Sequence, residues 1–180
     1  MKVCVDPGHG MANASANVFD SGATSGQFRE ADITLSYGLK LNEVLRARNF
    51  VVFMTRTNNT DPTPVDKRAP RAKAAGCEMF VSFHLNADDN PQAHGLEVLY
   101  GDDGSKDFAQ AMQTALIAAT NFRDRNIQHR PNLAVLKFDG PAVLMELGFI
   151  TNAAERSKLL EPQTQTTICN AVADVLRDEA

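Results

Sequence analysis

Residues 78–87 read EMFVSFHLNA. Apolar and aromatic side chains run almost without interruption from Met79 to Leu85, a pattern that predicts a strand in the core of the protein. His84 interrupts the run near its end. Because a buried polar group without a partner costs free energy, His84 is either a hydrogen-bonded core residue or part of a site at the end of this strand.

Similar short runs occur along the whole chain, and longer helical patterns lie between some of them. The runs predict further strands over 2–6, 50–56, 95–101, 133–138 and 142–147. Apolar residues at helical spacing predict helices over 31–48, 105–120 and 166–177, and Asn152 is expected to cap a short helix of its own. A helix is also predicted over 65–75, although Pro70 should break or kink it.

The alternation of strands and helices predicts the α/β class. We expect a single layered domain with a mixed, twisted sheet of about six strands that is flanked by helices. The sheet should be mixed because the strands predicted near residue 95 and over 133–147 do not all leave room for helical crossovers.

Composition indicates one ordinary globular unit. The chain has 180 residues, of which 43% are hydrophobic and 22% charged, so we expect one domain over residues 1–180 and a monomer. The formal net charge of −4 argues against nucleic acid as a partner. No apolar stretch approaches the roughly 20 residues that a transmembrane helix needs.

The cysteines carry no metal-binding or disulfide signature. Cys4, Cys77 and Cys169 lie far apart in the sequence and form no CxxC pair. We interpret all three as small buried hydrophobic residues, which leaves the redox compartment undetermined.

Polar residues at the ends of three predicted strands indicate a site. His9 follows the first strand, His84 ends a central strand and Glu146 ends the last strand, and open α/β sheets bind their ligands beyond the carboxyl ends of the strands. Two histidines and a carboxylate suit a catalytic zinc ion, which needs about three protein ligands. Glu30, at the start of the first helix, can supply a further carboxylate, although it could equally serve only to stabilise the helix N-terminus.

Several motifs in a fixed order resemble one family. VDPGHG (5–10), SGATSGQFREADI (21–33), VSFHLNA (81–87) and LMELGFITN (144–152), with MTR and GLEVLYG between them, are similar to the motifs of zinc-dependent N-acetylmuramoyl-L-alanine amidases of the amidase_3 type. The resemblance covers residues 3 to about 176. It implies that the residues that bind Zn²⁺ are His9, Glu30 and His84, and that Glu146 is catalytic.

The resemblance also implies a substrate and a reaction. The substrate would be peptidoglycan, cleaved at the amide between N-acetylmuramic acid and L-alanine. Zinc would activate water and polarise the scissile carbonyl, and Glu146 would move the proton to the departing amine. Two alternatives stay open, namely a zinc peptidase that cuts within stem peptides and a non-catalytic module that binds the cell wall.

The chain also departs from the family pattern. Residues 9–23, HGMANASANVFDSGA, form a longer loop rich in Asn, Ser and Ala, so we expect the rim of the site, but not its ligands, to depart from the family pattern. We expect no separate cell-wall-binding domain and no signal peptide in these residues. The expected place of action is the bacterial cell wall, reached either as a phage endolysin released from the cytoplasm or as an excised domain of a secreted amidase.

Five other polar residues are further candidates, and four of them have two interpretations each. Arg56 could orient a substrate carboxylate or pair with a core acid, and Asp6 could hold the outer nitrogen of His9 or cap a turn. Asn86 could bind the stem peptide or shape its loop, and Glu97 could face the site or solvent. Ser82 is a conceivable nucleophile, but the sequence offers no elbow motif or dedicated base for it.

Overall fold

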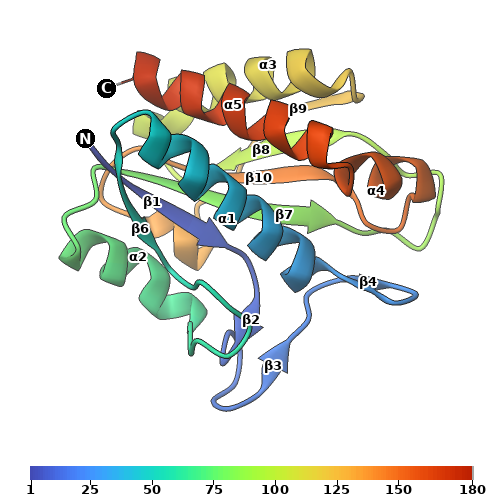
Figure 1. Cartoon of the computed structure of the whole chain (residues 1–180), viewed down its shortest axis with the longest axis horizontal. Helices are drawn as coiled ribbons and strands as arrows, with labels where there is room; N and C mark the ends of the chain where they lie inside the picture. Colours follow the sequence, from blue (N-terminus) through green and yellow to red (C-terminus); the bar gives the residue numbers. More distant parts are fainter. Residues whose placement is uncertain (180) are drawn as a thin grey trace.

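A computed structural model describes residues 1–179 and contains a mixed sheet of six strands, as the sequence predicts. The spatial order of the strands is β6-β1-β7-β10-β8-β9, with β7 and β10 at the centre (Figure 1). The β10–β8 pair is antiparallel and the other pairs are parallel. The strand bounds are β1 Lys2–Pro7, β6 Val51–Met54, β7 Met79–Asn86, β8 Leu96–Tyr100, β9 Asp124–His129 and β10 Ala142–Phe149.

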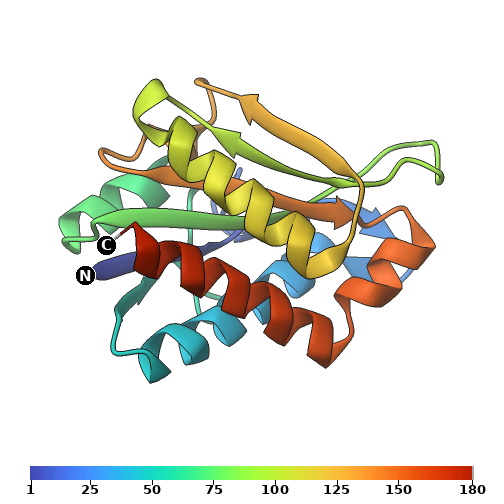
Figure 2. The ribbon, with the colours of Figure 1, turned by 90° about the horizontal axis from the view of Figure 1, so that it is seen from above.

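Helices cover the two faces of the sheet unequally. Three long helices, α1 (Glu30–Ala47), α3 (Lys106–Thr120) and α5 (Pro162–Asp178), pack together on one face, with α5 between the other two (Figure 2). The other face carries α2 (Val65–Ala74) and a 3₁₀ turn, η2 (Ala134–Lys137). Two short elements complete the set, the 3₁₀ turn η1 (Asp103–Ser105) and α4 (Ala153–Leu159).

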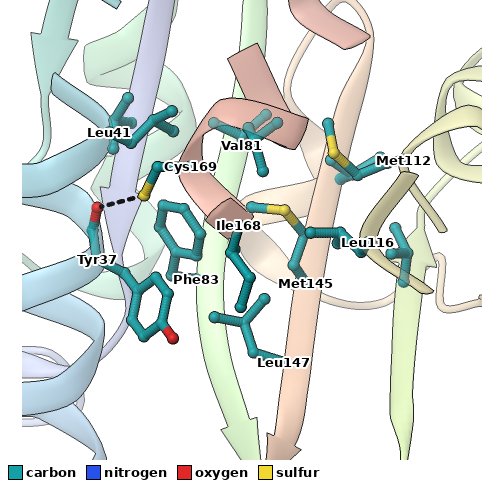
Figure 3. Close-up of a cluster of buried hydrophobic side chains, with 14 of the residues drawn as sticks. Tyr37, Leu41, Val81, Phe83, Met112, Leu116, Met145, Leu147, Ile168 and Cys169 are labelled. Atoms are coloured by element: carbon teal, nitrogen blue, oxygen red, sulfur yellow. Dashed lines mark hydrogen bonds between the residues drawn. The ribbon is translucent and has the colours of Figure 1, made fainter. Parts of the chain in front are cut away.

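The larger part of the core lies under the three long helices. Side chains of β7 and β10 meet the apolar stripes of the helices there (Figure 3). In α1 the stripe recurs every four residues, which places one helix face against the sheet. The buried residues drawn include Tyr37, Leu41, Val81, Phe83, Met112, Leu116, Met145, Leu147, Ile168 and Cys169.

The expectation for the cysteines is confirmed. Cys4 and Cys77 lie in the smaller cluster under α2 and η2, Cys169 lies in the larger one, and all three are buried and free. Burial raises the pKa of the Cys169 thiol to about 12, so this side chain behaves as a small hydrophobic group.

One predicted strand is wrong, and another strand was missed. Residues 133–138 do not form a strand, because η2 turns there and buries Val135, Leu136 and Phe138 against the smaller cluster. Short apolar runs fit a strand or a buried turn equally well, so the pattern could not decide. The sixth strand is instead β9, whose sequence DRNIQH is too polar to stand out as a strand.

The helices differ from expectation mainly at their ends. Helix α2 continues through Pro70. Proline has no N–H to donate to the carbonyl of Asp66, but Pro70 and Asp66 are both exposed, so water can reach this end of the helix. Helix α5 begins at Pro162, four residues earlier than predicted, with proline in its first turn. Asn152 does cap α4, since its side-chain oxygen accepts the backbone N–H groups of Ala154 and Glu155 at 3.1 Å each.

Within residues 1–179 no helix combines the length and the apolar character that crossing a membrane requires.

Candidate metal centre

The site lies where the carboxyl ends of β1 and β7 meet the N-terminus of α1. His9 lies two residues beyond the end of β1 and has a positive φ of 63°, and Gly10 continues the turn with a φ of 104°. Gly8 has no room for a side chain, because a Cβ there would meet the ring of His84 and the carbonyl of Phe83. The two glycines therefore let the backbone turn tightly enough for His9 to approach His84.

Three of the residues named from the sequence meet in one cluster. His9, Glu30 and His84 each offer one ligand atom, and these atoms all lie within 4.8 Å of one another. Nε2 of His9 lies 3.0 Å from Oε2 of Glu30, and Nδ1 of His84 lies 3.0 Å from Oε1 of Glu30. This set, called here the His–Glu–His cluster, could hold a metal ion, and two imidazoles with one carboxylate form a donor set of catalytic zinc sites.

Glu30 is buried and held by backbone donors. Its side chain is 4% exposed, and its two oxygens accept the N–H groups of Ala23 and Leu85 at 2.9 Å each. Burial alone would raise the pKa of this carboxyl group, but the imidazoles of His84 and His9 outweigh that effect and lower the pKa. Glu30 is therefore ionised, which is the form that binds a metal.

His9 has a second carboxylate partner, Asp20. Nδ1 of His9 lies 2.9 Å from Oδ2 of Asp20, and the N–H of Gly22 and the amide of Asn13 hold Asp20 in place. Burial lowers the pKa of His9, but Glu30 and Asp20 together raise it. With Nδ1 donating to Asp20, Nε2 is the nitrogen left to bind a metal.

The interpretation that Asp6 holds the outer nitrogen of His9 is wrong. Asp6 is fully buried and instead accepts hydrogen bonds from Arg68, Thr55 and Ser82 at 2.6–2.7 Å. Asp20 was missed because it lies in the longer loop of residues 9–23, where β2 (Gly10–Met11) and β3 (Phe19–Asp20) pair and bring it back to the site.

Removal of Asp20 should weaken metal binding. We expect Asp20→Ala to lower zinc affinity about 10- to 100-fold, because the outer hydrogen bond no longer fixes the imidazole of His9. Competition against a chelator of known affinity measures the effect. Asp89→Ala is the matched control, since Asp89 is exposed and lies outside the His–Glu–His cluster. Equal zinc affinity in the two variants would contradict the role of Asp20.

Glu146 lies beside the cluster without belonging to it. In β10 it is in register with His84 of β7 on one side and Glu97 of β8 on the other. Its Oε2 is buried and has no hydrogen-bond partner among the described residues, and burial raises the pKa of the group to about 7. A buried carboxyl oxygen without a partner is expensive, so Glu146 is positioned for something other than stability.

Two buried arginines fix the backbone that carries His9. Arg56 donates to the carbonyls of Pro7, Gly8 and Ala31 at 2.7–3.0 Å. Arg68 donates to the carbonyl of His9 at 2.6 Å and pairs with Asp6. Arg56 therefore has a structural role, although it binds backbone carbonyls rather than the expected acid. Arg68 was not predicted, because the sequence of α2 is typical of a solvent-exposed, basic helix.

The remaining candidates are placed as follows. Asn86 donates to Glu97 at 2.8 Å, so both side chains lie on the site's face of the sheet. Ser82 is fully buried and donates its hydroxyl to Asp6, which leaves it unavailable as a nucleophile. A pocket of about 160 Å³ opens beside His9 and His84, and Asn13 and Leu133 line its wall.

The fold and the site point to the hydrolase class, because an α/β domain here carries a His–Glu–His cluster that could hold a metal ion, with a buried carboxylate beside it at the strand ends. The family model Amidase_3, described as N-acetylmuramoyl-L-alanine amidase, matches residues 3–178, and the chain belongs to this family.

Known relatives agree with this assignment. N-acetylmuramoyl-L-alanine amidase LytC of Bacillus subtilis is 30% identical over 96% of this chain, and the probable cell wall amidase LytH of Staphylococcus epidermidis is 27% identical over 97%. The match spans 34% of LytC and 57% of LytH. The catalytic domain of the amidase CwlV from Bacillus (Paenibacillus) polymyxa var. colistinus superposes with a TM-score of 0.89 at 29% identity, over 99% of this chain and 97% of that one.

Proposed function

We propose that this chain hydrolyses the amide between N-acetylmuramic acid and L-alanine in peptidoglycan, and that it does so with zinc. The observation that carries the proposal is the His–Glu–His cluster with Glu146 beside it, in a chain that matches the amidase family over residues 3–178. The whole described chain then acts as one catalytic unit whose substrate is the bacterial cell wall.

The metal fits the residues that would hold it. His9, Glu30 and His84 supply two imidazole nitrogens and one ionised carboxylate, and the cluster contains no cysteine that would favour a closed structural site. When bound, zinc lowers the pKa of water and polarises the amide carbonyl. Asp20 orients His9 through Nδ1, and the backbone donors to Glu30 keep that carboxylate in place.

Glu146 is the group that moves the proton. Its carboxylate accepts a proton from the attacking water and later donates the same proton to the departing amine of L-alanine. The amide C–N bond breaks, the glycan keeps the carboxylate and the peptide leaves as an amine. A pKa of about 7 suits a group that must both accept and donate near neutral pH.

Metal removal tests the proposal. A chelator should abolish the release of peptide from purified peptidoglycan, because it would remove the ion that activates water and polarises the amide carbonyl. Added zinc should restore the release. Mass spectrometry of the digest should find stem peptides that begin with L-alanine. Full activity of extensively dialysed, metal-free protein would contradict the zinc mechanism.

The same digest separates the alternatives. A peptidase would release fragments with new amines inside the stem peptide and leave L-alanine on the sugar. A non-catalytic module would bind cell walls without any loss of turbidity. The biological setting stays a prediction, and the gene decides it: neighbouring lysis genes would support a phage endolysin, whereas an upstream signal sequence would contradict it.

A further inference from the structure

A row of four polar residues crosses the sheet from the candidate metal centre to the edge strand β9. His84, Glu146 and Glu97 occupy matching register positions in β7, β10 and β8, so their side chains share one face. Arg125 of β9 continues the row by contacting Glu97. All four residues retain partial exposure, so solvent reaches this row of side chains.

The guanidinium group of Arg125 has one edge, at Nε, in contact with Glu97, while its other edge, at Nη1 and Nη2, is free. Its Nε lies 3.4 Å from Oε2 of Glu97, and its guanidinium carbon lies 5.1 Å from the ring centroid of Phe149. The absence of a side chain at Gly95 makes room for its stem, since a Cβ there would lie 2.8 Å from Cγ of Arg125. The side chain is 33% exposed, and Nη1 and Nη2 have no hydrogen-bond partner within residues 1–179.

A local irregularity in β9 sets the direction of Arg125. The β8–β9 register shifts between Leu96 and Val98, so that two residues of β9 face Glu97 alone. The second of these, Asn126, has a positive φ of 63°. Bulges of this kind occur next to active sites, where they redirect a side chain. A bulge is not needed to form an ion pair at a sheet edge, and exposed ion pairs contribute little to stability.

We propose that Nη1 and Nη2 of Arg125 bind a carboxylate of the stem peptide, on the peptide side of the cleaved amide. The inference rests on the proposed amidase function and adds a subsite to it. Strand spacing places Arg125 roughly 14 Å from the position of His84. This distance corresponds to about four extended residues, so the peptide would lie across β10, β8 and β9.

The chemistry of the row favours an anionic group at this end. Glu97 and Glu146 would repel a carboxylate over β8 and β10, whereas the free edge of a guanidinium offers two parallel N–H donors in the geometry that a carboxylate accepts. Glu97 uses only the Nε edge of Arg125, and Asn86 holds Glu97 in turn.

Two matched substrates test the subsite. One is a soluble muramyl peptide with free carboxylates on the stem, and the other is the same compound with those groups converted to carboxamides. The wild type should prefer the carboxylate form by about 10- to 100-fold in kcat/KM, and Arg125→Gln should lose that preference while cleaving the carboxamide form as before. Arg125→Lys should keep part of it. Arg123→Gln is the control, because Arg123 is exposed and makes no side-chain hydrogen bond within residues 1–179.

A binding measurement separates this inference from the proposed function. Calorimetry should detect tighter binding of the free acidic stem peptide than of its carboxamide counterpart, and Arg125→Gln should remove the difference. If the wild type failed to cleave the muramyl peptides but still bound the acidic stem peptide more tightly than its carboxamide counterpart, only the amidase function would be overturned. Equal losses for both substrates, or equal binding of both peptides by the wild type, would overturn the subsite.

Discussion

Glu146→Gln should keep its zinc and still lose about 10²- to 10⁴-fold in the rate of peptidoglycan hydrolysis, the typical cost of removing a positioned general base. Glutamine preserves the shape of the side chain but cannot accept and return a proton. The metal should stay because Glu146 lies outside the His–Glu–His cluster, in the register position next to His84. Zinc stoichiometry and peptide release, measured on the same preparation, check both halves of the expectation.

The control is Glu43→Gln, an exposed glutamate on α1 whose side chain is 69% accessible, and it should leave rate and zinc content unchanged. A Glu146→Gln protein that came without zinc, and whose activity returned when metal was added, would show that Glu146 is a ligand and not the proton carrier.

Substitutions in the His–Glu–His cluster should act through zinc content. Glu30→Gln replaces an ionised carboxylate with a neutral amide, which is a poor zinc ligand, so affinity and hydrolysis should fall together. His9→Ala and His84→Ala each remove one of three protein ligands and should cost more than the roughly 10- to 100-fold expected for an outer hydrogen-bond partner. Each variant is assayed at low and at high zinc.

The response to excess zinc distinguishes the two glutamates. High zinc should partly rescue Glu30→Gln, because mass action refills a weakened site. It should not rescue Glu146→Gln, whose site is already full. Rescue of Glu146→Gln with no rescue of Glu30→Gln would reverse the two assignments.

Polar interruptions at strand ends predicted the candidate site, Glu30 at the start of the first helix offered a further carboxylate, and the family resemblance then assigned Glu30 to the metal. His9, His84 and Glu146 could be found because each follows or ends an apolar run, where an unpaired polar group would be costly. Asp20 and Arg68 could not be found in this way. They reach His9 from a polar loop and a basic helix, and the contacts depend on how distant segments fold back.

The fold shows the same limit. Buried strands such as β7 and β10 carry a strong apolar signal, whereas β9 at the edge has two charged residues and an asparagine among its six residues. Residues 133–138 show the opposite error: their apolar side chains predicted a strand, but a 3₁₀ turn buries them instead. Pairing with β8 makes β9 a strand, and packing against the smaller cluster buries the 3₁₀ turn; local pattern encodes neither of these tertiary contacts.

The buried Arg56 and Arg68 have a consequence for how the proposed metal would be acquired. Both guanidinium groups tie the backbone around His9 to the interior through carbonyls that are present whether or not an ion is bound. Small zinc domains fold only as the ion arrives, since nothing else holds their ligands together. Here the donors are brought together by the core itself, so we expect the proposed zinc to bind late and reversibly to an already rigid scaffold. Chelated protein should then unfold as cooperatively as the loaded form.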